Sequence, residues 1–364
     1  MSLAVGIIGL PNVGKSTIFN ALSNGKAAAE NYPFCTIDPN HGIVAVPDKR
    51  LNRITSLIPT QKVVPTFMEL VDIAGLVKGA SKGDGLGNQF LGHIKDVNAV
   101  VHVVRCFEND DIVHVEGSID PERDISIIDT ELMLTDLGTV ERGIQRTEKV
   151  AKSGDKEAVL RLSVFKKAQE ALSKGIPIRK EFSDPSDLKL LSELHLLTSK
   201  PVLYVANVDD NTLQDDNEAV MKVRSIASQE NAGCIKICGK LEEELVALSD
   251  EDKNLFLADL GLEEPGLSVL TRAAYTLLGL ETFFTAGETE NRAWTIVKGA
   301  KAPEAAGVIH SDFEKGFIKA DVYSIPDLET YKSEVALRAA GKIRSEGRDY
   351  IVQDGDIMFF KFNV

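Results

Sequence analysis

The clearest chemistry near the start of the chain belongs to the sequence Gly9-Leu10-Pro11-Asn12-Val13-Gly14-Lys15-Ser16. Its two glycines allow successive backbone N–H groups to face phosphate oxygens without Cβ clashes, and the helix that follows adds the positive end of its dipole. Lys15 can contact the β- and γ-phosphates, while Ser16 can hold Mg²⁺. We therefore predict a phosphate-binding loop, and a nucleotide site that includes Gly9, Asn12, Val13, Gly14, Lys15, Ser16 and Thr17.

A second group of residues can complete the metal site. Asp72 ends an apolar strand and is followed by Ile73-Ala74-Gly75, so its carboxylate can lie opposite Ser16 while the Gly75 N–H meets the γ-phosphate. Thr36 lies between the phosphate loop and this strand, where a threonine can join the metal shell once a γ-phosphate is present. We predict that Ser16, Thr36 and Asp72 hold Mg²⁺.

Two later sequences are placed to read the base. Asn207-Val208-Asp209-Asp210 follows a strand where GTPases carry Asn-Lys-x-Asp, and Cys238-Gly239-Lys240 follows the next strand. We predict base contacts from Asn207, Val208, Asp210 and Gly239. Val208 stands where GTPases carry the lysine, and the absence of a lysine at this position favours ATP. The retained Asp210 favours GTP, because a carboxylate only accepts hydrogen bonds and guanine offers two donors. The side-chain amide of Asn207 can also accept a hydrogen bond from adenine N6.

Hydrolysis needs a group that orients water, and Leu76 stands where Ras-like enzymes place a glutamine. His114, in a polar segment after a strand, is the predicted replacement, so the catalytic prediction is Lys15 and His114. The alternative for His114 is a surface histidine at a domain junction. For Asn12, a role in holding K⁺ against the phosphates and a role in bracing the loop both stay open.

Composition sets the limits on the class of protein. The chain has 364 residues, 43% of them apolar and 26% charged, which is typical of a globular protein of two to three domains. Its net charge of −14 argues against indiscriminate nucleic-acid binding. No apolar stretch is long enough for a membrane span, the N-terminus lacks a leader pattern, and the four cysteines are too scattered for a disulfide framework. We expect a cytoplasmic protein that does not bind membranes.

Apolar strands alternate with helices over residues 1–119 and again over 200–280, which predicts a parallel α/β domain in two parts. Residues 281–364 indicate a compact α+β module that ends in a hairpin over Tyr350–Asn363. Residues 120–199 form an insertion with heptad spacing at Ile127, Leu134, Leu137, Ile144 and Ala151, then at Ala158, Leu162, Phe165 and Leu172, which predicts an antiparallel helical hairpin. Between Glu141 and Lys167 it carries eight bases and four acids, which indicates either an RNA-binding face or a solvated one.

Five segments resemble the YchF/Obg-like ATPase family from end to end: Gly9–Thr17, Asn31–Asn40, Val71–Phe90, Arg105–Asn109 and Arg292–Ile296. The resemblance implies a P-loop G domain, an inserted helical coiled-coil domain and a C-terminal β-grasp domain of the TGS type. It also implies that ATP is preferred over GTP and that the partner is the ribosome, with its large subunit and ribosomal RNA as the expected contacts. One departure is Asp210, where the family usually has glutamate.

These observations favour a Mg²⁺-dependent ATPase with slow intrinsic turnover that acts as a nucleotide-controlled switch in translation or a stress response. A GTPase of the same architecture and a non-hydrolysing RNA-binding adaptor are the alternatives. A metabolic kinase fits less well, because the insertion has heptad spacing instead of an arginine-bearing lid.

Overall fold

The computed structural model describes residues 3–23, 40–73, 85–109 and 114–363. Contacts divide these residues into two compact units. The first unit takes in residues 3–23, 40–42 and the described part of 69–270; the second takes in residues 43–68 and 271–363. No pattern in the sequence indicates that residues 43–68 belong with the C-terminal residues, and the predicted domain boundaries stay predictions.

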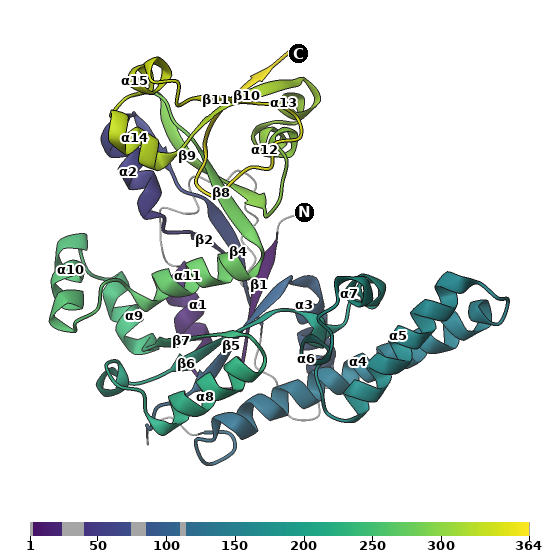
Figure 1. Cartoon of the computed structure of the whole chain (residues 1–364). Helices are drawn as coiled ribbons and strands as arrows, with labels where there is room; N and C mark the ends of the chain where they lie inside the picture. The colour runs from purple at the N-terminus through teal and green to yellow at the C-terminus, as the bar shows by residue number, and fades with distance from the viewer. Residues whose placement is uncertain (1–2, 24–39, 74–84, 110–113, 364) are drawn as a thin grey trace. The chain divides into compact units, whose positions relative to one another are not determined.

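A six-stranded sheet forms the centre of the first unit, in the order β2-β4-β1-β5-β6-β7 (Figure 1). The strands are β1 (Ala4–Ile8), β2 (His41–Ala45), β4 (Phe67–Asp72), β5 (Ala99–Arg105), β6 (Val202–Asn207) and β7 (Gly233–Ile237). β1 pairs in parallel with β4 and β5, and the pairs β5–β6 and β6–β7 are also parallel. Every residue of β1, β5 and β6 is buried, as in a sheet covered on both faces. The predicted parallel α/β fold is confirmed.

Helices lie between these strands and continue after β7, and the predicted site lies at one edge of the sheet. They are α1 (Lys15–Ser23), α3 (Gly85–Asp96), α8 (Glu218–Gln229), α9 (Gly239–Val246), α10 (Asp250–Asp259) and α11 (Gly266–Leu277), with a short 3-10 turn, η5 (Asp210–Thr212). The carboxyl ends of parallel strands meet at one edge, which is where open α/β sheets bind ligands. Gly9, Asp72, Cys106, Asn207 and Cys238 lie at the ends of their strands and therefore share that edge.

The inserted residues form a hairpin of two long helices that extends from the parallel sheet (Figure 1). Its elements are α4 (Pro121–Ala151), α5 (Lys156–Ser173), α6 (Ile178–Glu181), α7 (Pro185–Leu191) and the 3-10 turns η3 (Ser192–Leu194) and η4 (Leu197–Ser199). Asp120 and Asp155 cap the two long helices by accepting hydrogen bonds from Arg123 N and Ala158 N. The predicted antiparallel hairpin is confirmed.

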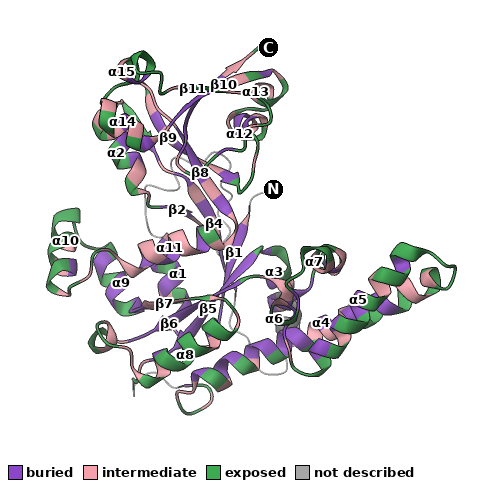
Figure 2. Cartoon of the chain, viewed as in Figure 1, coloured by how far each residue is buried: buried purple, intermediate pink, exposed green. Residues whose placement is uncertain are grey.

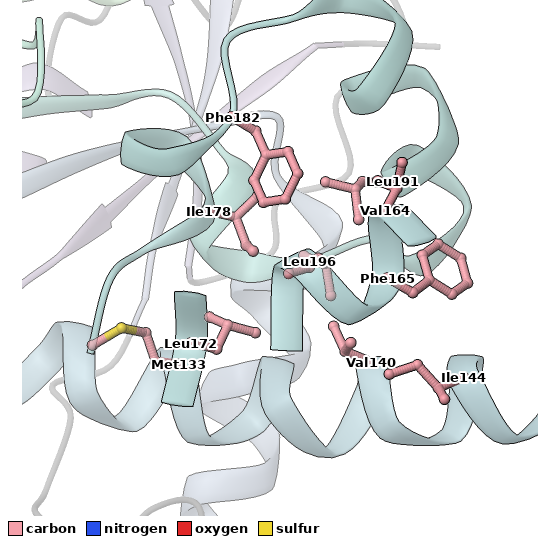
Figure 3. Packing of buried hydrophobic residues seen from close by; sticks show 11 residues of the cluster. Met133, Val140, Ile144, Val164, Phe165, Leu172, Ile178, Phe182, Leu191 and Leu196 are labelled. Atoms are coloured by element: carbon pink, nitrogen blue, oxygen red, sulfur yellow. The ribbon is translucent and has the colours of Figure 1, made fainter. Parts of the chain in front are cut away.

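The predicted heptad register is wrong in part, because the buried core of the insertion uses a different residue of α4 at one position. Figure 3 shows Val140 and Ile144 of α4 packed with Phe165 and Leu172 of α5, and with residues from the later helices. Leu134, a predicted core residue, is 49% exposed, and Met133 is buried in its place. The buried stripe has its members at 133, 137, 140 and 144, so Leu134 points away from α5.

The second unit is built on a mixed sheet in the order β11-β10-β12-β8-β9-β3. Its strands are β3 (Lys62–Val64), β8 (Leu280–Thr285), β9 (Glu290–Val297), β10 (Phe317–Tyr323), β11 (Arg344–Glu346) and β12 (Ile357–Phe362). Its helices are α2 (Lys49–Leu57), α12 (Ala302–Ile309), α13 (Ser311–Lys315), α14 (Ile325–Tyr331) and α15 (Glu334–Ala339). The hairpin β8–β9 is antiparallel, β12 joins β8 in parallel, and α12 packs on the sheet, as in a β-grasp domain.

The predicted hairpin over Tyr350–Asn363 is wrong. β12 pairs with β10 and β8, while Ile351 forms an isolated bridge with Lys301. Asp356 explains the difference, because its carboxylate accepts hydrogen bonds from the Tyr350 hydroxyl at 2.7 Å and Gln353 N at 2.9 Å, which closes a tight turn instead of a two-stranded ladder. None of the helices in the described ranges combines the length and apolarity needed to cross a bilayer.

Candidate nucleotide-binding site

Both glycines of the phosphate loop have a backbone conformation that favours glycine, and neighbouring atoms leave no space for a side chain at either position. Gly9 has φ +153° and Gly14 has φ +96°, a region that side chains disfavour. A Cβ at Gly9 would lie 2.5 Å from the Val103 carbonyl oxygen, and a Cβ at Gly14 would lie 2.2 Å from Nδ2 of Asn207. The loop therefore packs against β5 and β6 so closely that only glycine fits at these positions.

Lys15 is the cation at the centre of this loop. It is the first residue of α1, it is 7% exposed, and its Nζ donates a hydrogen bond to the Leu10 carbonyl oxygen at 2.7 Å. Burial lowers the pKa of Lys15 to about 8, and the nearby Asp72 carboxylate opposes that shift. A buried ammonium with so little compensating charge gains from an anion placed beside it, such as a polyphosphate.

Ser16 and Asp72 lie together next to this lysine. The Ser16 hydroxyl hydrogen-bonds the Asp72 carboxylate, whose pKa is raised by burial and lowered in opposition by Lys15 and Ser16. The Oδ1 atom of Asp72 is buried and has no hydrogen-bond partner within the described part of the chain. A hydroxyl beside a carboxylate oxygen without a partner is an oxygen donor set that suits Mg²⁺. The other predicted members, Thr36 and Gly75, lie outside the described residues.

No group of three or more histidine, cysteine, aspartate or glutamate side chains that could hold a metal occurs among the residues the structure describes. This fits a magnesium site that takes most of its ligands from phosphates and water, as Mg²⁺ usually does in such sites.

Asn207 ties the phosphate loop to the second predicted base loop. Its side chain is buried, its Nδ2 donates to the Val13 carbonyl oxygen at 2.8 Å, and its Oδ1 accepts from Gly239 N at 2.9 Å. An amide has two N–H groups and two acceptor positions on oxygen, so half of this capacity stays available for a base. The N–H of Gly239 is already engaged by Asn207.

Of the other residues predicted to contact the base, one lies in the apolar core and another is exposed. Val208 is 3% exposed and its N–H donates to Ile237 O at 2.8 Å, so its side chain belongs to the apolar core. Asp210 is exposed at the start of η5, and Lys240 is exposed on α9. Base contacts from Val208, Asp210 and Gly239 stay predictions.

His114 is buried, which contradicts the alternative of a surface histidine. It is 8% exposed, and its Nε2 lies 2.9 Å from Oδ2 of Asp124 in the first turn of α4. Its Nδ1 accepts a hydrogen bond from Glu116 N at 3.1 Å. Asp124 is not among the residues predicted from the sequence; the available signal for it was a carboxylate in the helical turn that follows the histidine.

The parallel sheet, the glycine-bounded loop before α1, the carboxylate that ends β4 and the amide that ends β6 together define a P-loop nucleotide-binding protein of the G-domain class. Residues 4–135 match a family model described as "50S ribosome-binding GTPase". Residues 280–363 match the model YchF-GTPase_C, described as "Protein of unknown function (DUF933)".

Relatives similar to the chain over its whole length identify the particular family. The "Ribosome-binding ATPase YchF" of Bacillus subtilis is 53% identical and that of Escherichia coli O157:H7 is 51% identical, each aligned over 100% of both chains. The solved structure of the Schizosaccharomyces pombe YchF GTPase has a TM-score of 0.90 and 38% identity, and covers 99% of this chain and 98% of its own. The chain belongs to the YchF family, as the sequence resemblance predicted.

Proposed function

We propose that the chain is a ribosome-associated P-loop ATPase whose bound nucleotide controls its action on the translation apparatus. The observation that carries the proposal is the buried Lys15 beside Asp72, since the loop offers a cation and backbone donors to a polyphosphate. The bacterial relatives with more than half of their residues identical are named as ribosome-binding ATPases.

Magnesium fits the donor set of Ser16 and Asp72. The Oδ1 of Asp72, which has no hydrogen-bond partner among the described residues, supports the presence of the ion in the working protein. Thr36 would join these residues when a γ-phosphate is bound. The ion would neutralise the negative charge that the β- and γ-phosphates carry during transfer. K⁺ is proposed as a further ligand at Asn12, an exposed residue with φ of +62°, while loop bracing stays the alternative.

ATP is the proposed nucleotide. GTPases use the lysine of Asn-Lys-x-Asp beside the base, and here a buried Val208 takes that position. Asn207 retains one N–H and one acceptor position, which suit N7 and N6 of adenine. GTP is the second candidate, because the exposed Asp210 carboxylate suits guanine donors and the Schizosaccharomyces pombe relative is described as a GTPase.

The ribosome is the proposed partner, through its large subunit and ribosomal RNA. The match of residues 4–135 to a model described as "50S ribosome-binding GTPase" supports the large subunit. A ribosomal partner also supports a cytoplasmic location. For hydrolysis, Lys15 and His114 are the proposed catalytic residues, with His114 supplying the water-orienting group that Leu76 cannot supply.

Nucleotide binding and turnover of the purified chain test this proposal. ATP should displace a fluorescent ATP analogue at lower concentration than GTP, and phosphate release should continue over many turnovers. Lys15→Ala should weaken ATP binding by about two orders of magnitude or more, because it removes the charge-assisted contacts to the phosphates. Lys49→Ala, a change to an exposed lysine of α2, is the control and should leave ATP affinity unaltered.

Each outcome bears on a different part of the proposal. Equal ATP affinity in the Lys15→Ala and Lys49→Ala variants would contradict the phosphate-loop assignment. Tighter binding of GTP than ATP would establish the GTPase alternative. Phosphate release that stops after a single turnover would favour the non-hydrolysing adaptor.

A further inference from the structure

The hydrogen bonds of His114 define the tautomer of its ring. The backbone N–H of Glu116 can only donate, so Nδ1, which lies 3.1 Å from it, is an acceptor and carries no proton. In the neutral imidazole Nε2 must then carry the proton, and it donates to Oδ2 of Asp124 at 2.9 Å. Both ring nitrogens are therefore engaged within the protein, and neither is free to orient water or to contact a phosphate oxygen.

Asp124 is itself held firmly in place. It is 3% exposed, and its other oxygen, Oδ1, accepts from Nε and Nη2 of Arg123 at 3.1 and 2.9 Å. Arg123 also donates to the hydroxyl and the carbonyl oxygen of Ser118. The carboxylate that accepts from His114 is thus fixed by the first turn of α4 and by the segment that leads into it.

The same helix forms the exposed arm of the molecule. α4 continues without interruption from Pro121 to Ala151, so Asp124 lies at its base and the hairpin tip at its other end (Figure 1). Between them Asp129 of α4 pairs with Arg179, whose side chain is 10% exposed, at 2.8 Å, and Arg179 pairs with Glu230 at 3.0 Å. These ion pairs attach α4 to the part of the first unit that contains the sheet. Asp124 lies before Asp129 in α4, and the outer part of the arm lies after it.

We propose that Asp124 restrains His114 in an inactive orientation, and that a partner bound to the α4–α5 arm releases the histidine by displacing the first turn of α4. This inference rests on the proposed role of His114 in hydrolysis. Such a restraint would keep basal ATP turnover low, and its release would let the partner stimulate hydrolysis. Asp124 acts here through His114 and touches no reacting atom.

Substitution of Asp124 tests the restraint. Loss of a charge-assisted hydrogen bond shifts a conformational equilibrium by roughly 10- to 100-fold, so Asp124→Ala should raise basal kcat by about tenfold or more with the KM for ATP unchanged. Further stimulation by ribosomes should shrink by the same factor. Glu122→Ala removes another first-turn carboxylate, which is exposed, and should leave basal kcat at the parent value.

A spectroscopic measurement provides a readout that is independent of turnover. Nitrogen-15 spectra of the His114 ring should show the Nε2–H tautomer in the parent chain, and a mixture of tautomers in Asp124→Ala. Asp124→Asn keeps the side-chain volume and an acceptor oxygen, so it should give a smaller rise in kcat. It also keeps the test open should the alanine variant fail to fold.

The outcomes separate the restraint from the proposed function. If His114→Ala leaves kcat unchanged, the proposed role of His114 fails. If His114→Ala lowers kcat about 10²–10⁴-fold while a folded Asp124 variant lowers kcat or leaves both kcat and tautomer unchanged, the restraint is wrong. The double variant Asp124→Ala/His114→Ala should fall to the level of His114→Ala alone, and a higher rate would also contradict the inference.

Discussion

At the scale of single residues, Lys15 shows how this fold prepares a site for an anion. Its ammonium is buried and donates a hydrogen bond to the neutral carbonyl oxygen of Leu10 in its own loop. Between pH 8 and 10.5 the folded chain therefore binds fewer protons at Lys15 than the unfolded chain, since the pKa falls from 10.5 to about 8. The charged lysine costs stability below pH 8, and this cost is relieved as pH rises through that window.

Nucleotide binding should reverse this shift, which gives a prediction for pH dependence. Phosphates beside Lys15 favour its charged form, so binding takes up a proton when pH exceeds about 8. Affinity for a fluorescent ATP analogue should fall about tenfold between pH 7 and 9, since one pH unit above the pKa leaves about a tenth of the lysine charged. Calorimetry at pH 9 in two buffers with different ionisation enthalpies should detect the proton. Constant affinity up to pH 9.5 would show that the pKa of Lys15 is not depressed.

Sequence alone predicted the residues of the phosphate loop but not the partners that hold them. The need for glycine at Gly9 and Gly14 follows from local backbone chemistry, and the strand–loop–helix order is visible in the sequence. The bond from Asn207 to Val13 joins residues 194 positions apart, and the one from His114 to Asp124 depends on how α4 begins. Such partners follow from tertiary packing, which residue spacing does not encode.

At the scale of elements, the bases of the α4–α5 arm divide into two groups. Arg161, Lys166 and Lys167 of α5 pair with nearby glutamates. Within the described part of the chain, Arg142, Arg146, Lys149 and Lys152 have no carboxylate at ion-pair distance, and all four are exposed. Figure 2 shows that exposed positions occur along the outer half of α4. Lys156, exposed at the start of α5, likewise has no carboxylate at ion-pair distance among the described residues. Uncompensated positive charge is therefore concentrated at the outer end of the arm, which favours an interaction face over a solvated one.

Charge reversal on this face should weaken ribosome binding. Changing Arg142, Arg146, Lys149 and Lys152 to glutamate should lower co-sedimentation with ribosomes at least tenfold and flatten its salt dependence, because fewer RNA phosphates are neutralised. Reversal of Lys166, Lys167 and Lys174, whose charges are already paired, should have a smaller effect. ATP affinity should stay at the parent value in both variants. Equal pelleting of the parent and the α4 variant, at low and moderate salt, would show that this face is merely solvated.

Element types could be predicted more readily than element pairings. The apolar runs of β5 and β6 are visible in the sequence, because strands buried on both faces carry a dense apolar signal. The heptad spacing placed Leu134 in the core, whereas the inner face of α4 carries Met133 and the buried Asp136, which accepts from the N–H groups of Leu197 and Thr198. The pairing of β12 with β10 and β8 depends on strands far away in the chain.

At the scale of the whole molecule, the chain contributes to its second unit twice. Residues 43–68, which lie between the predicted metal ligands Thr36 and Asp72 in the sequence, supply α2 and β3 to that unit. Arg50 pairs with Asp354 at 2.7 Å, and Asn291, fully buried, donates to Ile58 O at 2.8 Å. The chain that runs from one predicted metal ligand to the other therefore passes through the second unit.

Residues 43–68 should therefore be necessary for the stability of the second unit. Ile54 of α2 is fully buried in a cluster with Phe284, Leu328 and Leu337, so Ile54→Ala should lower the free energy of unfolding of this unit by about 2–4 kcal/mol. Trp294 is the only tryptophan of the chain and stacks on Phe283 in the same unit, so its fluorescence reports that transition during denaturant unfolding. Asn52→Ala, at an exposed position of the same helix, is the control.

The same dependence should appear when the chain is divided. A fragment of residues 271–364 lacks α2 and β3, and leaves the apolar surfaces of Phe284 and Leu328 without the side chains of Leu51 and Ile54. Its Trp294 emission should resemble that of the denatured chain, and addition of a peptide of residues 43–68 should shift the emission towards that of the intact protein. A fragment that unfolds cooperatively at the same denaturant concentration as the parent chain would show that the second unit is complete without this segment. An Ile54→Ala variant with an unaltered Trp294 transition would lead to the same conclusion.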